Sequence, residues 1–140
     1  EMELGIGVHG EPGVTREKLK PADEIVDYLL DHILADLDFV GSEVAVLVNG
    51  LGATPLEELY LMYRHVHQIL AQSNIRVFRV WVGEFATAME MTGMSISLMP
   101  VDDELKALLN AQADTTQCLH DAAHPRTRRC SGSFPPKEAL

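Results

Sequence analysis

Apolar and polar positions divide the first 110 residues into short extended runs and amphipathic helical segments. Residues 4–8 alternate between the two faces of a strand, and residues 44–48 form a continuous aliphatic run, typical of a buried strand. Residues 75–82 and 95–99 predict two further strands. The apolar spacing of three and four residues in the intervening segments predicts helices, at residues 25–37, 56–70 and 105–109.

Strands that alternate with helices indicate an α/β fold. We expect two layers, a mixed or mostly parallel sheet with helices, and an undecided helix or loop at residues 84–91. Four strands are few to be covered on both faces, so the domain is expected to pack against a partner domain.

Turn and capping residues predict where these elements begin. Residues 10–13 read Gly-Glu-Pro-Gly, which suits a type II turn after the first strand. Residues 54–57 supply Thr as a helix N-cap, Pro at the first helical position and Glu for a capping box. Asp102 is predicted to cap the last helix.

Composition changes near residue 110. The 140-residue chain is 46% hydrophobic and carries a net charge of −10, and the acidic excess lies in residues 1–110. We predict a folded domain at 1–110 and an irregular or disordered tail at 111–140.

An acidic chain argues against nucleic acid as a partner, and the apolar runs are too short to cross a membrane. We therefore expect a cytoplasmic protein, and the early first strand suggests a part of a longer one.

Candidate chemistry begins at the first predicted strand. Alternation places Gly5, Gly7 and His9 on one face, where the two glycines would leave room for a small molecule beside the imidazole. Histidine titrates near neutral pH, which suits it to catalysis. The alternative interpretation is a histidine that only ends the strand and binds the turn.

Two other segments are weaker candidates. Residues 49–55 join a strand to a helix, where anions can bind, but they match neither a P-loop nor a dinucleotide motif. A plain strand-to-helix turn is the favoured interpretation. The tail holds four residues of zinc-ligand type in irregular spacing, and we expect no metal site there. They are Cys118, His120, His124 and Cys130.

Three ordered motifs resemble the substrate-binding subunit of dihydroxyacetone kinases. They are MELGIGVHGEPG at residues 2–13, VNGLGATPLEELY at 48–60 and ATAMEMTGMSISL at 86–98. The first motif is similar to the one that opens the second, C-terminal domain of that subunit. The resemblance thus implies half of a two-domain kinase subunit. The chain departs from the usual family residues at Gly50, Ala88 and Glu90.

The resemblance implies a covalent role for His9. In that family the matching histidine adds to the ketone carbon of dihydroxyacetone and forms a hemiaminal; the strand pattern places Gly5 and Gly7 beside it as substrate-binding positions. Glycerol has no carbonyl group, so it cannot form this bond. A hydroxyl of the captured triose then attacks a phosphoryl group, which gives dihydroxyacetone phosphate.

The same resemblance implies that other components are needed. The family's general-base aspartate belongs to an N-terminal domain missing here, so we expect this chain alone to be inactive. No cofactor is expected in the chain. The phosphoryl donor, ADP or ATP with Mg, is expected on a nucleotide-binding kinase subunit or domain. Either ATP or the phosphotransferase system is expected to supply the phosphoryl group. A homodimer is possible. The alternative functions are a non-catalytic carbonyl-ligand sensor or coactivator and a ligand-free remnant.

Overall fold

The computed structural model describes residues 1–7, 11–114, 118–120 and 129–130. Along the chain, a hairpin of β1 (Met2–Leu4) and β2 (Thr15–Glu17) precedes a larger α/β unit. That unit consists of α1 (Ala22–Asp36), β3 (Glu43–Gly50), α2 (Leu56–Gln72), β4 (Arg76–Gly83), β5 (Met94–Pro100) and α3 (Asp103–Asn110). Three short strands follow it: β6 (Ala113–Asp114), β7 (Cys118–His120) and β8 (Arg129–Cys130).

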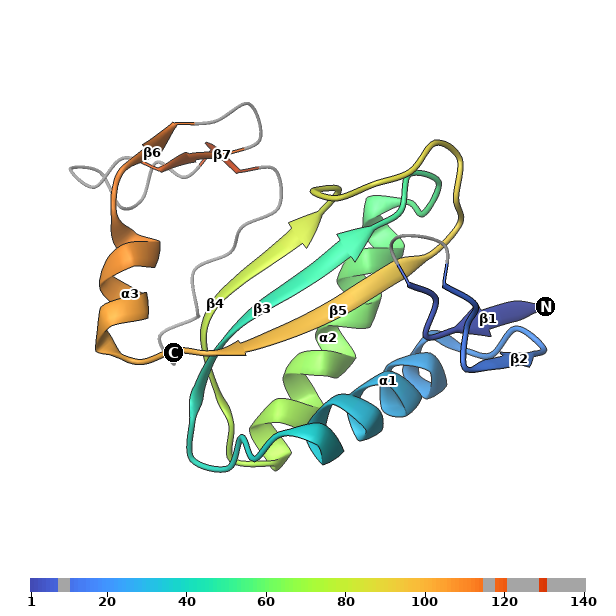
Figure 1. Ribbon diagram of the computed structural model, residues 1–140, viewed down its shortest axis with the longest axis horizontal. Coiled ribbons are helices and arrows are strands. Elements are labelled where there is room, and N and C mark those ends of the chain that lie inside the picture. The colour runs from blue at the N-terminus through green and yellow to red at the C-terminus, as the bar shows by residue number, and fades with distance from the viewer. Residues whose placement is uncertain (8–10, 115–117, 121–128, 131–140) are drawn as a thin grey trace.

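The central sheet has the strand order β4-β3-β5 (Figure 1). β3 runs parallel to β4 and antiparallel to β5, so the sheet is mixed, as predicted. The register shifts by one residue near Phe78, where β4 contributes an extra residue against Val44 and Ala45.

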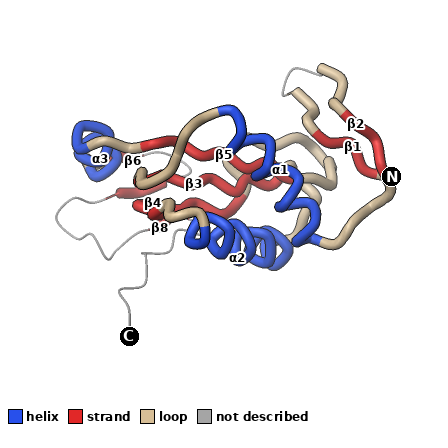
Figure 2. Tube along the Cα trace, turned by 90° about the horizontal axis from the view of Figure 1, so that it is seen from below, coloured by secondary structure: helices blue, strands red, loops and turns tan. Residues whose placement is uncertain are grey.

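One face of the sheet carries the core. α2 packs against β3 and β4, and α1 packs beside α2 (Figures 1 and 2). Alternate side chains of the strands point into this layer, and helix residues meet them. The fully buried members are Val26, Leu30, Val44, Val46, Val48, Leu59, Val66, Leu70 and Val82.

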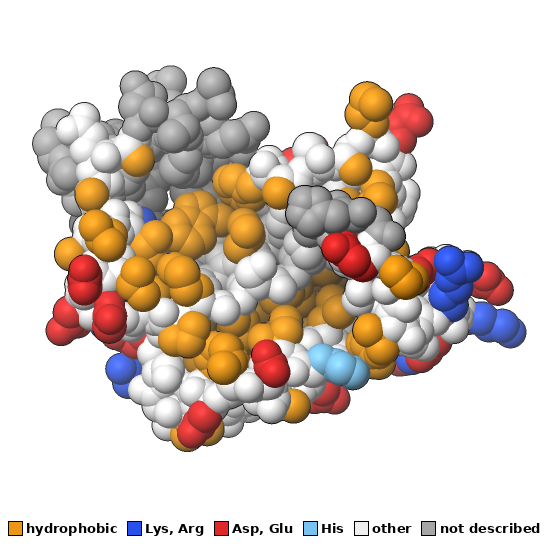
Figure 3. All heavy atoms as spheres, in the orientation of Figure 1, with side chains coloured by type: hydrophobic (Ala, Val, Ile, Leu, Met, Phe, Trp, Pro, Cys, Tyr) orange, Lys and Arg blue, Asp and Glu red, His pale blue; other side chains and the backbone are white. Residues whose placement is uncertain are grey.

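The residues that the structure describes cover the opposite face of the sheet only in part. α3 lies at one end of it, where Lys106 pairs with Glu43 and Arg79 donates to the carbonyl oxygen of Leu109. Beyond α3, hydrophobic side chains gather over the open part of the sheet (Figure 3). Strand alternation and register place Leu47, Trp81 and Met99 on this face. They form the open-face patch, and Met99 is 40% exposed.

The prediction of one strand through residues 4–8 is wrong. β1 ends at Leu4, and Gly5 has a φ of +76°, in the left-handed region that breaks strand alternation. Leu4 is buried, but Ile6 is 49% exposed and does not belong to the core. Among the described strands, β1 pairs only with β2 and does not join the central sheet.

Helix starts follow the predictions in part. Asp102 accepts a hydrogen bond from the backbone N–H of Leu105 at 2.8 Å, which confirms its capping role. The N-cap of α2 is Pro55 and not Thr54, and among the described residues the helix start has no side-chain capping hydrogen bond. Residues 84–91 contain no helix. Of the two predicted alternatives for this segment, helix or loop, the structure has the loop.

β6, β7 and β8 form a small antiparallel sheet within the range predicted as irregular tail. The domain boundary after residue 110 stays a prediction. Among the described residues, no helix is long and apolar enough to cross a membrane.

Candidate functional site

The β1–β2 hairpin carries the first candidate motif. The Glu3 carboxylate closes its base, because Oε1 accepts from the backbone N–H of Gly13 at 2.8 Å and Oε2 accepts from Arg16 Nε at 2.9 Å. The backbone N–H of Gly13 and then the charge of Arg16 hold the pKa of Glu3 below its ordinary value, despite partial burial. Sequence reasoning gave Glu3 no role, since its partners lie ten or more residues away.

The glycines of this motif lie close to neighbouring side chains. A Cβ on Gly5 would lie 2.9 Å from Val14 Cγ2, and one on Gly7 would lie 1.9 Å from Glu11 Oε2. The positive φ of Gly5 adds a second reason for glycine there. The space beside both glycines therefore holds side chains of the same hairpin. His9 lies outside the described residues, so its role and those of Gly5 and Gly7 in binding stay predictions.

A second candidate site lies where β3 and β4 end. Asn49, the buried penultimate residue of β3, holds the loop after β4. Its Oδ1 accepts from the backbone N–H groups of Phe85 at 2.8 Å and Ala86 at 2.9 Å, and its Nδ2 donates to the carbonyl oxygen of Ala86 at 2.7 Å. A polar residue that ends an aliphatic strand was the available sequence signal for this role.

The loops at 51–54 and 84–93 are joined along their length. The Thr54 hydroxyl donates to the carbonyl oxygen of Gly93 and accepts from its N–H, both at 2.8 Å. Leu51 and Ala53 add backbone hydrogen bonds to the second loop. At Gly52, where φ is +109°, a Cβ would lie 2.0 Å from a carbonyl oxygen of that loop, so only glycine fits.

These paired loops form a fixed platform at the carboxyl end of β3 and β4, which is the usual ligand edge of an α/β sheet. Figure 1 places the β1–β2 hairpin toward the same end of the molecule. The start of α2 beside the platform carries Glu57 and Glu58, whose charges oppose an anion there. The geometry agrees with the interpretation of residues 49–55 as a strand-to-helix turn.

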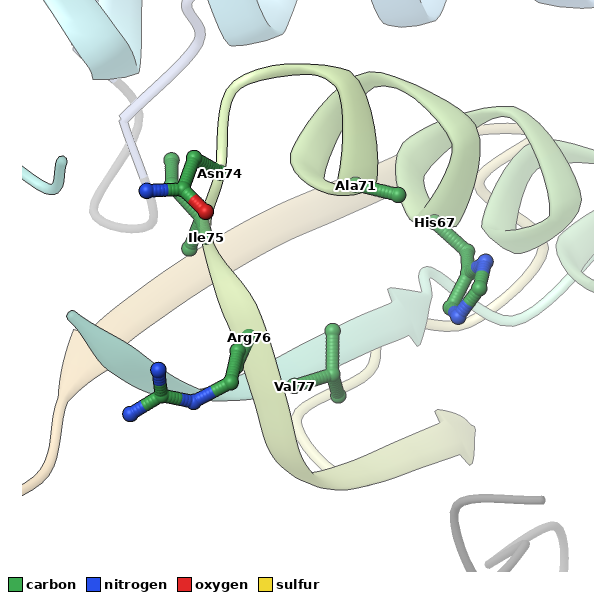
Figure 4. Close-up of a pocket in the computed structure, with 6 residues that line it drawn as sticks. All are labelled: His67, Ala71, Asn74, Ile75, Arg76 and Val77. Carbon is green, nitrogen blue, oxygen red and sulfur yellow. The ribbon is translucent and has the colours of Figure 1, made fainter. Parts of the chain in front are cut away.

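A separate hollow of about 260 Å³ lies at the other end of the sheet (Figure 4). It lies between the last turns of α2 and the start of β4, and its lining residues are His67, Ala71, Asn74, Ile75, Arg76 and Val77. Since none of these belongs to the three sequence motifs, the hollow is not the predicted site.

No group of three or more His, Cys, Asp or Glu side chains that could hold a metal occurs in the described part of the chain. The side chains of the tail residues considered for zinc lie outside that part.

The Dak1 domain family matches residues 1–117. The chain belongs to the Dak1 domain family. Among curated relatives, a dihydroxyacetone-binding subunit of a PTS-dependent dihydroxyacetone kinase from Listeria innocua is 45% identical over 116 residues, covering 82% of this chain and 35% of the relative. The corresponding PEP-dependent subunit of Escherichia coli is 35% identical, with 82% of this chain and 39% of the relative covered. This Dak1 chain thus spans little more than a third of these relatives.

Solved structures share the fold. A structure concerned with regulation of the dha operon of Lactococcus lactis matches with a TM-score of 0.79 and 32% identity, covering 87% of this chain and 39% of the other. A dihydroxyacetone kinase operon co-activator matches with a TM-score of 0.71 and 33% identity, over 77% of this chain and 34% of the other. The mixed α/β arrangement of this Dak1 chain therefore also occurs in proteins of regulatory description.

Proposed function

We propose that this Dak1 chain is part of a dihydroxyacetone kinase and binds dihydroxyacetone for phosphoryl transfer. The main support is the match of residues 1–117 to the Dak1 domain family, together with relatives named as dihydroxyacetone-binding subunits. The closed hairpin and the platform at the strand ends support a binding role, since a fixed scaffold positions a ligand at little entropic cost.

His9 is the proposed covalent anchor. The lone pair of one ring nitrogen forms a bond to the ketone carbon, the carbonyl electron pair moves to the oxygen, and that oxygen takes a proton from solvent. The second ring nitrogen then releases its proton. Gly5 and Gly7 are proposed to border the substrate, through their backbone. Glycerol is rejected because it has no carbonyl carbon to attack.

NMR with dihydroxyacetone labelled with ¹³C at the ketone carbon, and protein labelled with ¹⁵N in histidine, tests the anchor. We expect the labelled carbon to move to the tetrahedral region and to show a one-bond coupling to nitrogen. The variant His9→Gln and labelled glycerol should show neither change. Bound dihydroxyacetone without carbon–nitrogen coupling would contradict the covalent step, and no binding at all would contradict substrate binding by this chain.

Phosphoryl transfer is proposed to need further components. We place the chain in the second domain of the subunit, with a general base on its first domain and the donor, ADP or ATP with Mg, on a nucleotide-binding subunit or domain. Under this proposal the chain alone has no kinase activity. The kinase is proposed to act in the cytoplasm. Phosphorylation of dihydroxyacetone by the isolated chain plus a donor subunit would contradict this division of roles.

The open-face patch supports a packing partner for the sheet. Leu47, Trp81 and Met99 lie on a face that no described helix other than α3 covers. Trp81 is the single tryptophan of the chain, so its fluorescence reports on this face. We expect its emission to shift to the blue when the first domain, or a second copy in a homodimer, is added, and the shift should be absent in Met99→Glu. An unchanged spectrum would exclude this face as the contact.

A regulatory function is the second candidate, because two structural matches above 30% identity concern operon regulation and a co-activator. In that case the chain binds the carbonyl ligand but takes no part in phosphoryl transfer. A complete subunit that captures dihydroxyacetone and remains inactive with every donor subunit supports this alternative. Phosphorylation of dihydroxyacetone by the complete subunit with a donor subunit supports the kinase function.

A further inference from the structure

A cluster of polar side chains joins α1 to α2, apart from the hairpin and the loop platform. His65 of α2 lies between two carboxylates of α1, Asp23 and Asp27, and its side chain is only 18% exposed. Arg64 and Gln68 of α2 complete the cluster. No step of the proposed function uses these residues.

Both ring nitrogens of His65 face oxygen atoms. Nε2 lies 2.7 Å from Oδ1 of Asp27, and Nδ1 lies 3.2 Å from Oε1 of Gln68, with a carboxylate oxygen of Asp23 at 3.9 Å. The Gln68 amide has a fixed orientation, because the same Oε1 accepts from Arg64 Nη1 at 3.1 Å and a guanidinium has only donors.

These contacts determine how many protons the ring carries. A carboxylate oxygen and an amide oxygen can only accept hydrogen bonds, so both ring nitrogens must donate. A neutral imidazole has one N–H and would turn a lone pair toward Asp27 or Gln68. The arrangement therefore fits a doubly protonated, cationic His65 and does not fit a neutral one.

The electrostatic balance agrees with this geometry. Burial opposes the charged ring, but hydrogen bonds to Asp27 and Gln68 and the charges of Asp23 and Asp27 outweigh it, so the pKa of His65 lies above 6.5. Arg64 holds the pKa of Asp23 below its ordinary value, so that carboxylate stays ionised when the histidine titrates.

We propose that His65 is a pH-sensitive link between α1 and α2, complete while the ring carries two protons and weakened when it loses one. Because protonation favours the folded state, the link contributes fully below pH 6.5, the ordinary value for histidine, and is lost as the pH rises through the higher folded-state value. The lowered pKa of Asp23 keeps that carboxylate ionised throughout this window.

NMR of ¹⁵N-histidine-labelled chain tests the protonation state. We expect the His65 signals to show both nitrogens protonated in acid and to titrate with a midpoint above pH 6.5, with assignment by His65→Gln. Asp27→Asn should lower the titration midpoint, whereas His67→Gln, an exposed histidine two residues along the same helix, should leave it unchanged. A midpoint at or below 6.5 would overturn the proposal.

Urea unfolding at several pH values tests the link itself. We expect the unfolding midpoint of the parent chain to fall between pH 6.5 and more alkaline pH, and His65→Gln to remove most of that fall. His67→Gln should keep it. An equal loss of stability in His65→Gln at every pH would show that the side chain only packs, and would overturn the proposal.

Discussion

Asn49 offers a direct test of how the loop platform is held. The change Asn49→Ala removes three short hydrogen bonds to the backbone of Phe85 and Ala86, between 2.7 and 2.9 Å long. A fourth contact, to Ser95 Oγ, is 3.5 Å long and contributes little. Each short bond is worth roughly 1 kcal/mol net, so we expect Asn49→Ala to lower the free energy of unfolding by about 3 kcal/mol.

Urea denaturation measures this loss, and hydrogen exchange of the Phe85 and Ala86 amides locates it. Both amides should exchange faster in Asn49→Ala. The matched control is Ser95→Ala, which removes only the long contact and should cost less than about 0.5 kcal/mol. Equal effects of the two substitutions, or unchanged exchange of both amides, would refute the assignment of Asn49 as the residue that holds this loop.

Three further changes have defined outcomes. Gly52→Ala should lower the melting temperature far more than Gly41→Ala, because both have positive φ but only the Cβ at residue 52 meets a carbonyl oxygen, at 2.0 Å. Thr54→Val should cost about 1–3 kcal/mol in urea unfolding, since a buried hydroxyl with two hydrogen bonds is replaced by a methyl group; a neutral effect would contradict its bridging role. The lowered pKa of Glu3 means that its stabilising effect is present above its ordinary value of 4.5 and is lost as the pH falls through the folded-state value. After correction for the pH dependence of the intrinsic exchange rate, the Gly13 amide should therefore be less protected from hydrogen exchange in acid. Glu3→Gln should remove this pH dependence of the protection.

The central α/β unit could be predicted from the sequence because its pattern is local. Apolar periodicity marks α1 and α2, and continuous or alternating apolar runs mark β3, β4 and β5, within one or two residues of their observed bounds except at the start of α1. The pairing of the loops could not be predicted in this way. Thr54 matches a capping pattern, yet its hydroxyl binds Gly93, 39 residues away, because the antiparallel pairing of β3 and β5 brings the two loops together.

The first motif shows a second limit of sequence patterns. Alternation assumes extended backbone at every position, and the left-handed Gly5 breaks that assumption after three residues. Its glycines are predicted to border a ligand, and in the structure the side chains of Val14 and Glu11 also lie close to them. Glycine in a motif identifies a close approach, and the sequence alone does not show whether a ligand or the chain itself makes it.

The separation of the hairpin from the central sheet has a consequence for the proposed site. Within the described part of the chain, β1 and β2 pair only with each other, and Glu3 closes their base. The loop platform is stabilised independently by Asn49 and Thr54. Interactions that share no partner contribute nearly additively to stability. Changes in the hairpin and in the platform should therefore act independently on folding, and a non-additive effect of Glu3→Gln and Asn49→Ala on dihydroxyacetone capture would show that the ligand itself connects the two parts.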